Sequence, residues 1–207
     1  MFYKGFELKI LKNIRVLDFG RYIAGPYCGA LLGDLGAEVI RIERLDGSED
    51  RFIHPLKDEG GEGAMFMQMN RNKKGMTLNP TKEGSATIVE KLIKSADVVI
   101  ANLPPQTLKR MGIDYETISK YNPGIILTTV SAFGAGGPYS ERVGFDGVGQ
   151  AMSGAAYLTG SENEPVKAYS PYIDYGTASL TAMGTLAAII ERNETGKGQI
   201  VEGALFA

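Results

Sequence analysis

Short runs of β-branched and aromatic residues alternate along the chain with longer segments in which apolar residues recur at helical spacing. The first unit of this kind covers residues 13–43. Its residues 14–19 are too few for a helix and suit a strand buried in a parallel sheet. Pro26 then fits the first turn of a helix, and Gly36 fits the left-handed conformation that ends one. Residues 39–42 form the next strand, so the chain opens with a strand, a helix and a second strand.

The same alternation continues along the rest of the chain. Further strands are predicted at residues 76–78, 97–101, 125–130 and 199–205. Helices are predicted from Asn79-Pro80 to residue 95, through Leu108 to Gly112, and over residues 114–121, 145–153 and 174–192. Mixed loop and short extended structure is predicted at residues 154–171. The pattern predicts an α/β fold with a Rossmann-like, doubly wound, mostly parallel sheet, in one domain over residues 1–207.

The edge formed by the carboxyl ends of the strands is where function is expected, because ligands of open α/β sheets bind there. Residues 20–26 follow the first strand and residues 43–44 follow the second, so both segments are expected to face one crevice. A glycine-rich loop over residues 131–138 leaves a later strand. Residues 45–64 form a long polar loop, which is typical of a functional or mobile segment.

Composition and charge exclude several classes of function. The formal net charge is −2 without a basic stripe, which argues against nucleic-acid binding. Cys28 is the only cysteine, and the first residues contain no apolar signal segment, so a reducing, cytoplasmic location is expected. No apolar run approaches the length that spans a membrane. The sequence stops at Ala207 within a periodic apolar segment, from which we expect further sequence to be missing.

An NAD-dependent oxidoreductase is one alternative interpretation of the first unit. The glycines among residues 20–29 would approach a dinucleotide, and Glu43 would bind its ribose. However, the glycine spacing is not G-x-G-x-x-G, and Arg44 follows Glu43 directly. Both departures argue against a binding site for a nicotinamide cofactor.

Two other polar features have ordinary surface explanations. His54 lies alone in the long loop, without an acidic or cysteine partner at ligand spacing, and is interpreted as a surface side chain. The basic run at residues 70–75 is interpreted as a solvated turn, with a phosphate contact as its alternative. The sequence contains no zinc or P-loop signature, and no metal site is predicted.

Asp174 has two interpretations at the start of the last predicted helix. As an N-cap, its carboxylate would accept backbone N–H bonds. As a nucleophile, it would be kept ionised by the helix N-terminus and would attack an activated acyl group. Asp146 is likewise a candidate cap for the helix that follows it. The residue types alone leave these roles open.

Several segments in this order resemble the family III CoA-transferases, also called the CaiB/BaiF or formyl-CoA transferase family. The resemblance covers nearly the whole chain, and the ordered set is more specific than any single segment. Its clearest parts are Val16-Leu-Asp-Phe, Ala24-Gly-Pro, residues 35–44, Asn70-Arg-Asn-Lys-Lys, Gly144-Phe-Asp, Asp174-Tyr-Gly-Thr and Glu194-Thr-Gly-Lys-Gly-Gln.

The resemblance implies an enzyme that moves CoA from an acyl-CoA to a free carboxylic acid. It assigns Asp174 as the residue that forms an enzyme-bound mixed anhydride and then an aspartyl-CoA thioester. Coenzyme A is implied as a substrate, with no permanently bound cofactor, and relatives form interlocked homodimers. The residues that match the family's CoA-binding positions are Tyr22, Ile23, Ala24, Arg44, Asn102, Leu103, Arg110 and Met111. Ile23 is a departure, because several relatives have glutamine there.

Two further departures bear on the function. The related α-methylacyl-CoA racemases use a histidine where this chain has Phe145, and because a phenyl ring cannot move a proton, racemisation is disfavoured. Family members are also substantially longer, with a second, smaller domain and a return segment. The chain is therefore interpreted as the large domain of such an enzyme, as one half of a two-chain enzyme, or as a catalytically silent CoA-binding fragment.

Overall fold

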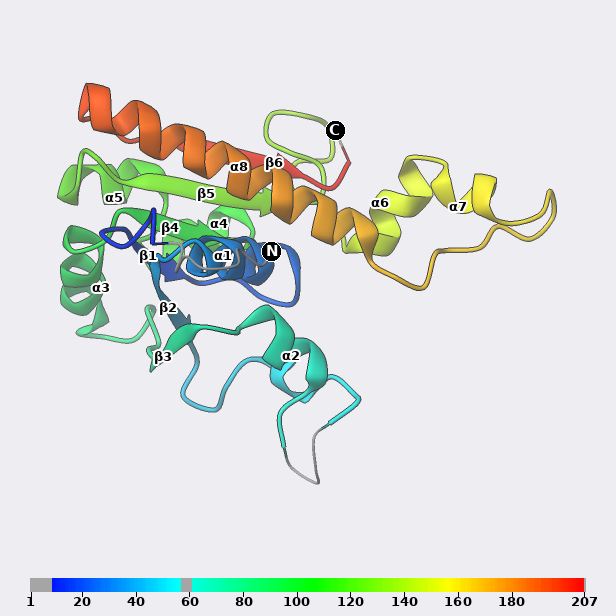
Figure 1. The fold of residues 1–207 in the computed structure, drawn as a ribbon, viewed down its shortest axis with the longest axis horizontal. Coiled ribbons are helices and arrows are strands. Elements are labelled where there is room, and N and C mark those ends of the chain that lie inside the picture. The colour runs from blue at the N-terminus through cyan, green and yellow to red at the C-terminus, as the bar shows by residue number, and fades with distance from the viewer. Residues whose placement is uncertain (1–8, 57–60, 207) are drawn as a thin grey trace.

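The computed structural model describes residues 9–56 and 61–206, and these build one parallel sheet covered by helices on both faces (Figure 1). Its strand order is β3-β2-β1-β4-β5-β6, and every neighbouring pair is parallel. The strands are β1 (Arg15–Asp18), β2 (Glu38–Glu43), β3 (Lys73–Thr77), β4 (Val98–Ala101), β5 (Ile126–Ser131) and β6 (Ile200–Ala204). The predicted α/β, doubly wound sheet is confirmed.

Two apolar cores lie on opposite faces of the sheet because successive strand residues point to opposite sides. In β1, Val16 belongs to one core and Leu17 to the other; Val98 and Val99 divide in the same way in β4. The first core is covered by α1 (Ala24–Asp34) and α8 (Tyr172–Thr195). The second is covered by α3 (Ser85–Lys94), α4 (Pro105–Met111) and α5 (Tyr115–Tyr121).

The remaining helices lie around the carboxyl edge of the sheet, where the strands point in Figure 1. They are the 3-10 helix η1 (Glu49–Phe52), α2 (Ala64–Met69), α6 (Asp146–Met152) and α7 (Ala155–Thr159). Helix η1 lies inside the predicted long loop, whose residues 57–60 are outside the described residues.

Helix α8 packs close to the sheet because the residues that face it are small. Thr185 Oγ1 lies 2.8 Å from Thr128 Oγ1 of β5, and both side chains are buried. A Cβ added to Gly203 of β6 would lie 2.1 Å from Thr181 Oγ1, so only glycine fits at this strand position. The first turn of α8 is thereby held at the carboxyl edge.

By length and composition alone, α8 is long and apolar enough to cross a membrane, which corrects the prediction that no segment approaches that length. Of its most apolar window, 39% is buried inside the fold. Its buried residues, among them Ala178, Ala182 and Ile189, belong to the first core. This packing is that of the core helix of an α/β domain.

Several predicted boundaries were wrong for local reasons. Helix α3 begins at Ser85 rather than after Pro80, because the Asn79 side chain accepts the N–H of Thr81 and forms a turn instead. Residues 154–171, predicted as loop and extended structure, include the short helix α7. The basic run at residues 70–75 is not a solvated turn throughout, since Lys73 begins β3.

Lys73 forms a buried ion pair with Asp18 at the carboxyl end of β1. Its ammonium donates to Asp18 Oδ2 and to the carbonyl of Pro26, each at 2.7 Å, and to Asn70 Oδ1 at 3.0 Å. The two charged side chains are 2% and 0% exposed. Burial by itself would raise the pKa of Asp18, but the neighbouring Lys73 and then Arg41 more than offset this and hold that pKa below its ordinary value.

Removing one charge of this pair should destabilise the fold strongly, because the other stays buried without compensation. We expect Asp18→Asn to lower the free energy of unfolding by about 3–5 kcal/mol, measured by urea titration followed by circular dichroism. The control is Glu90→Gln, which breaks the exposed Lys94–Glu90 pair and should cost at most about 0.5 kcal/mol. Similar losses in both variants would contradict the role of the buried pair.

Candidate functional site

A cavity of about 240 Å³ opens at the carboxyl edge of the sheet and contains Asp174. It is bounded by the turn after β1, the segments that follow β4 and β5, and the first turn of α8. We call it the Asp174 cavity. Its lining residues are Arg21, Tyr22, Ile23, Ala24, Asn102, Leu103, Pro104, Pro105, Val130, Ser131, Ala132, Ser140, Glu141, Arg142, Val143, Gly144, Phe145, Asp174 and Leu205.

The N-terminus of α8 is capped by another acidic residue, Asp146, and not by Asp174. Helix α8 begins at Tyr172, so Asp174 lies inside its first turn, and the predicted N-cap interpretation is wrong. Asp146 Oδ1 accepts the backbone N–H groups of Ile173 at 2.9 Å and of Asp174 at 3.2 Å. Its other oxygen accepts from Gln150. Asp146 was predicted to cap its own helix α6, but its carboxylate instead positions α8.

The Asp174 carboxylate is more easily protonated than an ordinary aspartate. The residue is buried, and none of the described residues donates a hydrogen bond to its side chain. Burial, followed by the negative charge of Asp146, raises the pKa of Asp174 to about 7. The prediction that the helix N-terminus keeps Asp174 deprotonated is therefore wrong, because burial and then the charge of Asp146 favour the protonated form. A carboxyl group with this pKa is present in both its acid and its ionised form near neutral pH.

Tyr22 forms one wall of the Asp174 cavity in a backbone conformation that is uncommon for a side chain of its size. Its φ is 60°, in the left-handed region. Its N–H donates to Asp50 Oδ2 at 3.1 Å. Its ring meets that of Phe145 edge to face, with 5.2 Å between centroids. Asp50 and Phe145 together hold a turn that would otherwise be strained.

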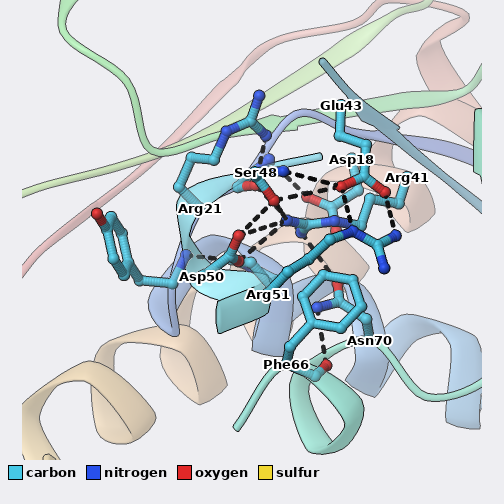
Figure 2. Close-up of polar contacts among 12 residues, drawn as sticks. Asp18, Arg21, Arg41, Glu43, Ser48, Asp50, Arg51, Phe66 and Asn70 are labelled. Carbon is cyan, nitrogen blue, oxygen red and sulfur yellow. Dashed lines mark hydrogen bonds and ion pairs between the residues drawn. The ribbon is translucent and has the colours of Figure 1, made fainter. Parts of the chain in front are cut away.

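Asp50 belongs to a buried charge network under this turn (Figure 2). Arg41 donates through Nη2 to both oxygens of Asp50, at 3.1 and 3.0 Å, and to Ser48 Oγ at 2.7 Å. Arg41 Nη1 also donates to the carbonyl of Gly20 at 3.2 Å. The side chains of Arg41 and Asp50 are 2% and 0% exposed. The long polar loop thus supplies the buried Asp50 that fixes the turn after β1.

Glu43 is occupied by a second part of the same network. It accepts from Arg51 and from the backbone N–H of Ser48, the latter at 3.2 Å. The guanidinium of Arg51 in turn lies 4.1 Å from the centroid of the Phe66 ring. This carboxylate is not free to bind a ribose, which further disfavours a nicotinamide site.

A second cavity, of about 470 Å³, adjoins the first along the edge of the sheet, and we call it the Arg110 cavity. Arg44 at its rim already pairs with Asp46 at 2.9 Å and with Glu49 at 2.8 Å, and all three side chains are exposed. Arg110 has no hydrogen bond or ion pair within the part of the chain that the structure describes. The lining residues are Phe19, Arg21, Ile42, Arg44, Leu45, Asp46, Leu78, Asn79, Pro80, Thr81, Leu103, Thr107, Arg110 and Met111.

Every predicted site residue lines one of these two cavities. Tyr22, Ile23, Ala24, Asn102 and Asp174 line the first, Arg44, Arg110 and Met111 line the second, and Leu103 lines both. His54, as predicted, is an exposed residue. No group of three potential metal ligands occurs among residues 9–56 and 61–206.

Asn102 is placed at the site, but its side chain is already engaged with the chain itself. Asn102 Oδ1 accepts the N–H of Arg21 at 2.7 Å, and its Nδ2 donates to the carbonyl of Arg21 at 2.8 Å. The side chain therefore clamps the turn after β1 to the end of β4. Arg21 lies in the segment 20–26 that was expected at the crevice, but the sequence did not single it out, because its proximity to Asn102 depends on the pairing of β1 with β4.

Comparison with known proteins identifies the relatives of the chain. The model of CoA-transferase family III matches residues 11–207. Succinyl-CoA–D-citramalate CoA-transferase of Chloroflexus aurantiacus is 37% identical over 203 residues, covering 95% of this chain and 49% of the relative. Succinyl-CoA:glutarate CoA-transferase of Mus musculus is 36% identical over 202 residues, covering 97% of this chain and 46% of the relative.

The fold also agrees with that of a solved structure. A CaiB/BaiF family protein from Brucella suis superimposes with a TM-score of 0.89 at 37% identity, covering 95% of this chain and 53% of that one. The chain spans about half the length of the curated relatives that it matches.

The raised pKa of Asp174 predicts the direction in which the stability of the fold changes with pH. In the unfolded chain the carboxyl group loses its proton near 3.8, whereas in the fold it keeps the proton up to about 7. Between these values the fold binds more protons, so Asp174 lowers the free energy of unfolding as pH rises. We expect Asp174→Asn to be more stable than the unmodified chain by about 1–3 kcal/mol at pH 8, with little difference at pH 4.

The measurement is urea unfolding of both proteins at each pH, and the quantity of interest is the difference between them. Asp34→Asn, which alters an exposed carboxylate paired with Arg71, serves as the control and should show no gain at pH 8. A gain in Asp174→Asn of equal size at both pH values would contradict the origin in a shifted pKa.

Proposed function

The chain belongs to CoA-transferase family III, and from this premise we propose that it carries the CoA-binding site and the nucleophile of an enzyme that moves CoA between an acyl-CoA and a free carboxylic acid. The observation that carries the proposal is the position of Asp174. Its carboxylate lies in a cavity and accepts no hydrogen bond from the described residues. That cavity adjoins a second one, which is lined by Arg21, Arg44 and Arg110.

In the proposed reaction a carboxylate oxygen of Asp174 attacks the thioester carbonyl, and the C–S bond breaks to release the CoA thiolate. The thiolate then attacks the aspartyl carbonyl of the mixed anhydride, releasing the donor acid and leaving an aspartyl-CoA thioester. The acceptor carboxylate attacks the carbonyl of that thioester, its C–S bond breaks to release the CoA thiolate again, and a second mixed anhydride forms. The thiolate finally attacks the acceptor's carbonyl, which gives the new acyl-CoA and restores Asp174.

The surroundings of Asp174 support this reaction in two ways. Apolar side chains line much of the cavity, including those of Tyr22, Phe145 and Leu205, and would limit the access of water to an anhydride. The absence of hydrogen bonds to the carboxylate from the described residues leaves its lone pairs available for attack. Phe145 also supports transfer over racemisation, because it cannot exchange a proton.

CoA would lie along the edge of the sheet, with its nucleotide in the Arg110 cavity and its thioester in the Asp174 cavity. Arg110 has no partner among the described residues, and the Arg44 ion pairs are exposed and therefore weak. Both arginines would then be available to phosphate oxygens. The pantetheine arm of CoA would contact Tyr22, Ile23, Ala24 and Leu103. Asn102 would act by holding the turn after β1 in place.

We also propose that the complete enzyme is a homodimer. The support in this chain is the apolar outer side of α8, where Leu180, Met183 and Ile190 are each more than 60% exposed. Since large apolar residues grouped on one surface commonly mark an interface, this side of α8 is the expected contact.

Direct trapping tests Asp174 as the nucleophile. The names of the relatives suggest succinyl-CoA as the first donor to try. The protein is incubated with succinyl-CoA, quenched with hydroxylamine and examined by peptide mass spectrometry. We expect a hydroxamate at Asp174, with none formed in Asp174→Ala, which should still bind CoA. Asp34→Asn is the control and should label normally.

The outcomes of this experiment separate the possible roles of the chain. Labelling of Asp174 together with exchange of CoA into a second acid would indicate an active transferase. CoA binding without labelling would indicate a silent CoA-binding part, and the proposed role of Asp174 would fail for this chain. Equal labelling in Asp174→Ala would place the nucleophile elsewhere.

The pH dependence of the labelling tests the influence of Asp146. Only the ionised carboxylate attacks, so the initial labelling rate should rise with pH and level off above about 7. In Asp146→Asn the negative neighbour is absent, so the pKa of Asp174 should fall and the midpoint should move to lower pH. A midpoint that stays in place while the rate falls at every pH would limit Asp146 to capping α8.

A further inference from the structure

Arg21 stands where the two cavities adjoin. It lines both the Asp174 cavity and the Arg110 cavity, and Leu103 is the other residue that they share. A ligand that reaches from Arg110 to Asp174 along this edge would therefore run past Arg21 and Leu103.

The guanidinium of Arg21 is anchored at one end and has donors to spare at the other. Its Nη1 donates to the carbonyls of Phe19 at 3.0 Å, Gly20 at 2.9 Å and Ile42 at 3.4 Å. Asn102 clamps the backbone of the same residue. No described residue accepts a hydrogen bond from Nε or Nη2. Since a guanidinium carries five N–H donors in one plane, the unused ones form a fixed group with known orientation.

Arg21 also lacks a counter-ion in the part of the chain that the structure describes. No carboxylate there forms an ion pair with it, and the nearby Asp50 is paired with Arg41. Figure 2 shows the guanidinium of Arg21 on the side away from Asp50. Burial, and then the positive charge of Arg41, lowers the pKa of Arg21 despite weaker attraction from Asp50 and Asp18. A bound anion would remove this cost of burying an unpaired charge.

We propose that Arg21 binds the diphosphate of CoA through Nε and Nη2. The inference rests on the proposed function, in which CoA extends from the Arg110 cavity to Asp174. The diphosphate joins the nucleotide to the neutral pantetheine arm, so it is the anionic part of CoA that belongs between the two cavities. Two parallel N–H donors of a guanidinium match two phosphate oxygens, which a single ammonium does not.

Calorimetric titration with CoA, 3′-dephospho-CoA and pantetheine tests the proposal in the unmodified chain, Arg21→Gln and Arg21→Lys. We expect Arg21→Gln to weaken the binding of CoA and of 3′-dephospho-CoA by the same factor, about 10- to 100-fold, because both ligands contain the diphosphate. Pantetheine should bind as before. The affinities of Arg21→Lys for CoA and 3′-dephospho-CoA should lie between those of the unmodified chain and those of Arg21→Gln. Arg71→Gln, outside both cavities, is the control and should change none of the three affinities.

Each result separates this inference from the proposed function. An unmodified chain that binds none of the ligands would overturn the proposed function and this inference with it. CoA binding that Arg21→Gln leaves within about twofold, or a loss for pantetheine as large as the loss for CoA, would overturn the role of Arg21 alone. The comparison between ligands within one variant controls for general damage to the fold, because such damage would weaken the binding of all three ligands.

A second measurement needs no substitution and covers the case in which both variants fail to fold. Arginines of the unmodified chain are labelled with phenylglyoxal, and the peptide containing Arg21 is quantified by mass spectrometry. We expect CoA and 3′-dephospho-CoA to slow the labelling of Arg21, and pantetheine to leave it unchanged. Equal labelling with and without CoA, under conditions where calorimetry shows CoA bound, would overturn the proposal.

Discussion

The site depends on charges buried beneath the turn that follows β1. Lys73 and Asp18 form one pair, and Arg41 and Asp50 form the other. A hydrophobic core alone could not hold this turn, because Tyr22 adopts a left-handed conformation and the backbone N–H groups there need acceptors. The paired carboxylates supply those acceptors, and the cations compensate for their burial. A rigid cavity wall is the result.

In the first turn of α8, neighbouring groups set the protonation of Asp174, the proposed nucleophile. Asp146 occupies the helix N-terminus that would otherwise stabilise an ionised Asp174. The same carboxylate orients the helix, and its charge adds to burial, the larger cause, in raising the pKa of Asp174. Because a carboxylate without hydrogen bonds is a better nucleophile and a less stable group, this arrangement would trade stability for reactivity in the proposed reaction.

The two adjoining cavities would let one edge of the sheet hold a ligand as long as the proposed CoA. The apolar part surrounds Asp174, and the arginines that suit phosphate stand at the other end, beyond Arg21 and Leu103. Asn102 connects these parts, since its side chain fixes the backbone of Arg21 across two neighbouring strands. The pairing of β1 with β4 thus positions the backbone of Arg21, the proposed ligand of the CoA diphosphate.

The alternation of apolar runs determined which strands and helices follow one another along the chain, because strand and helix periodicities are local properties. The sequence motifs placed the predicted site residues at one edge of the sheet. Local sequence did not determine which polar residues meet. Lys73 looked like part of a solvated turn, Asp146 like the cap of its own helix, and Asp174 like an N-cap. Their partners lie far away in the chain and are brought close only by the parallel sheet and by α8. The pKa of Asp174, like the clamp on Arg21, arises from those tertiary contacts.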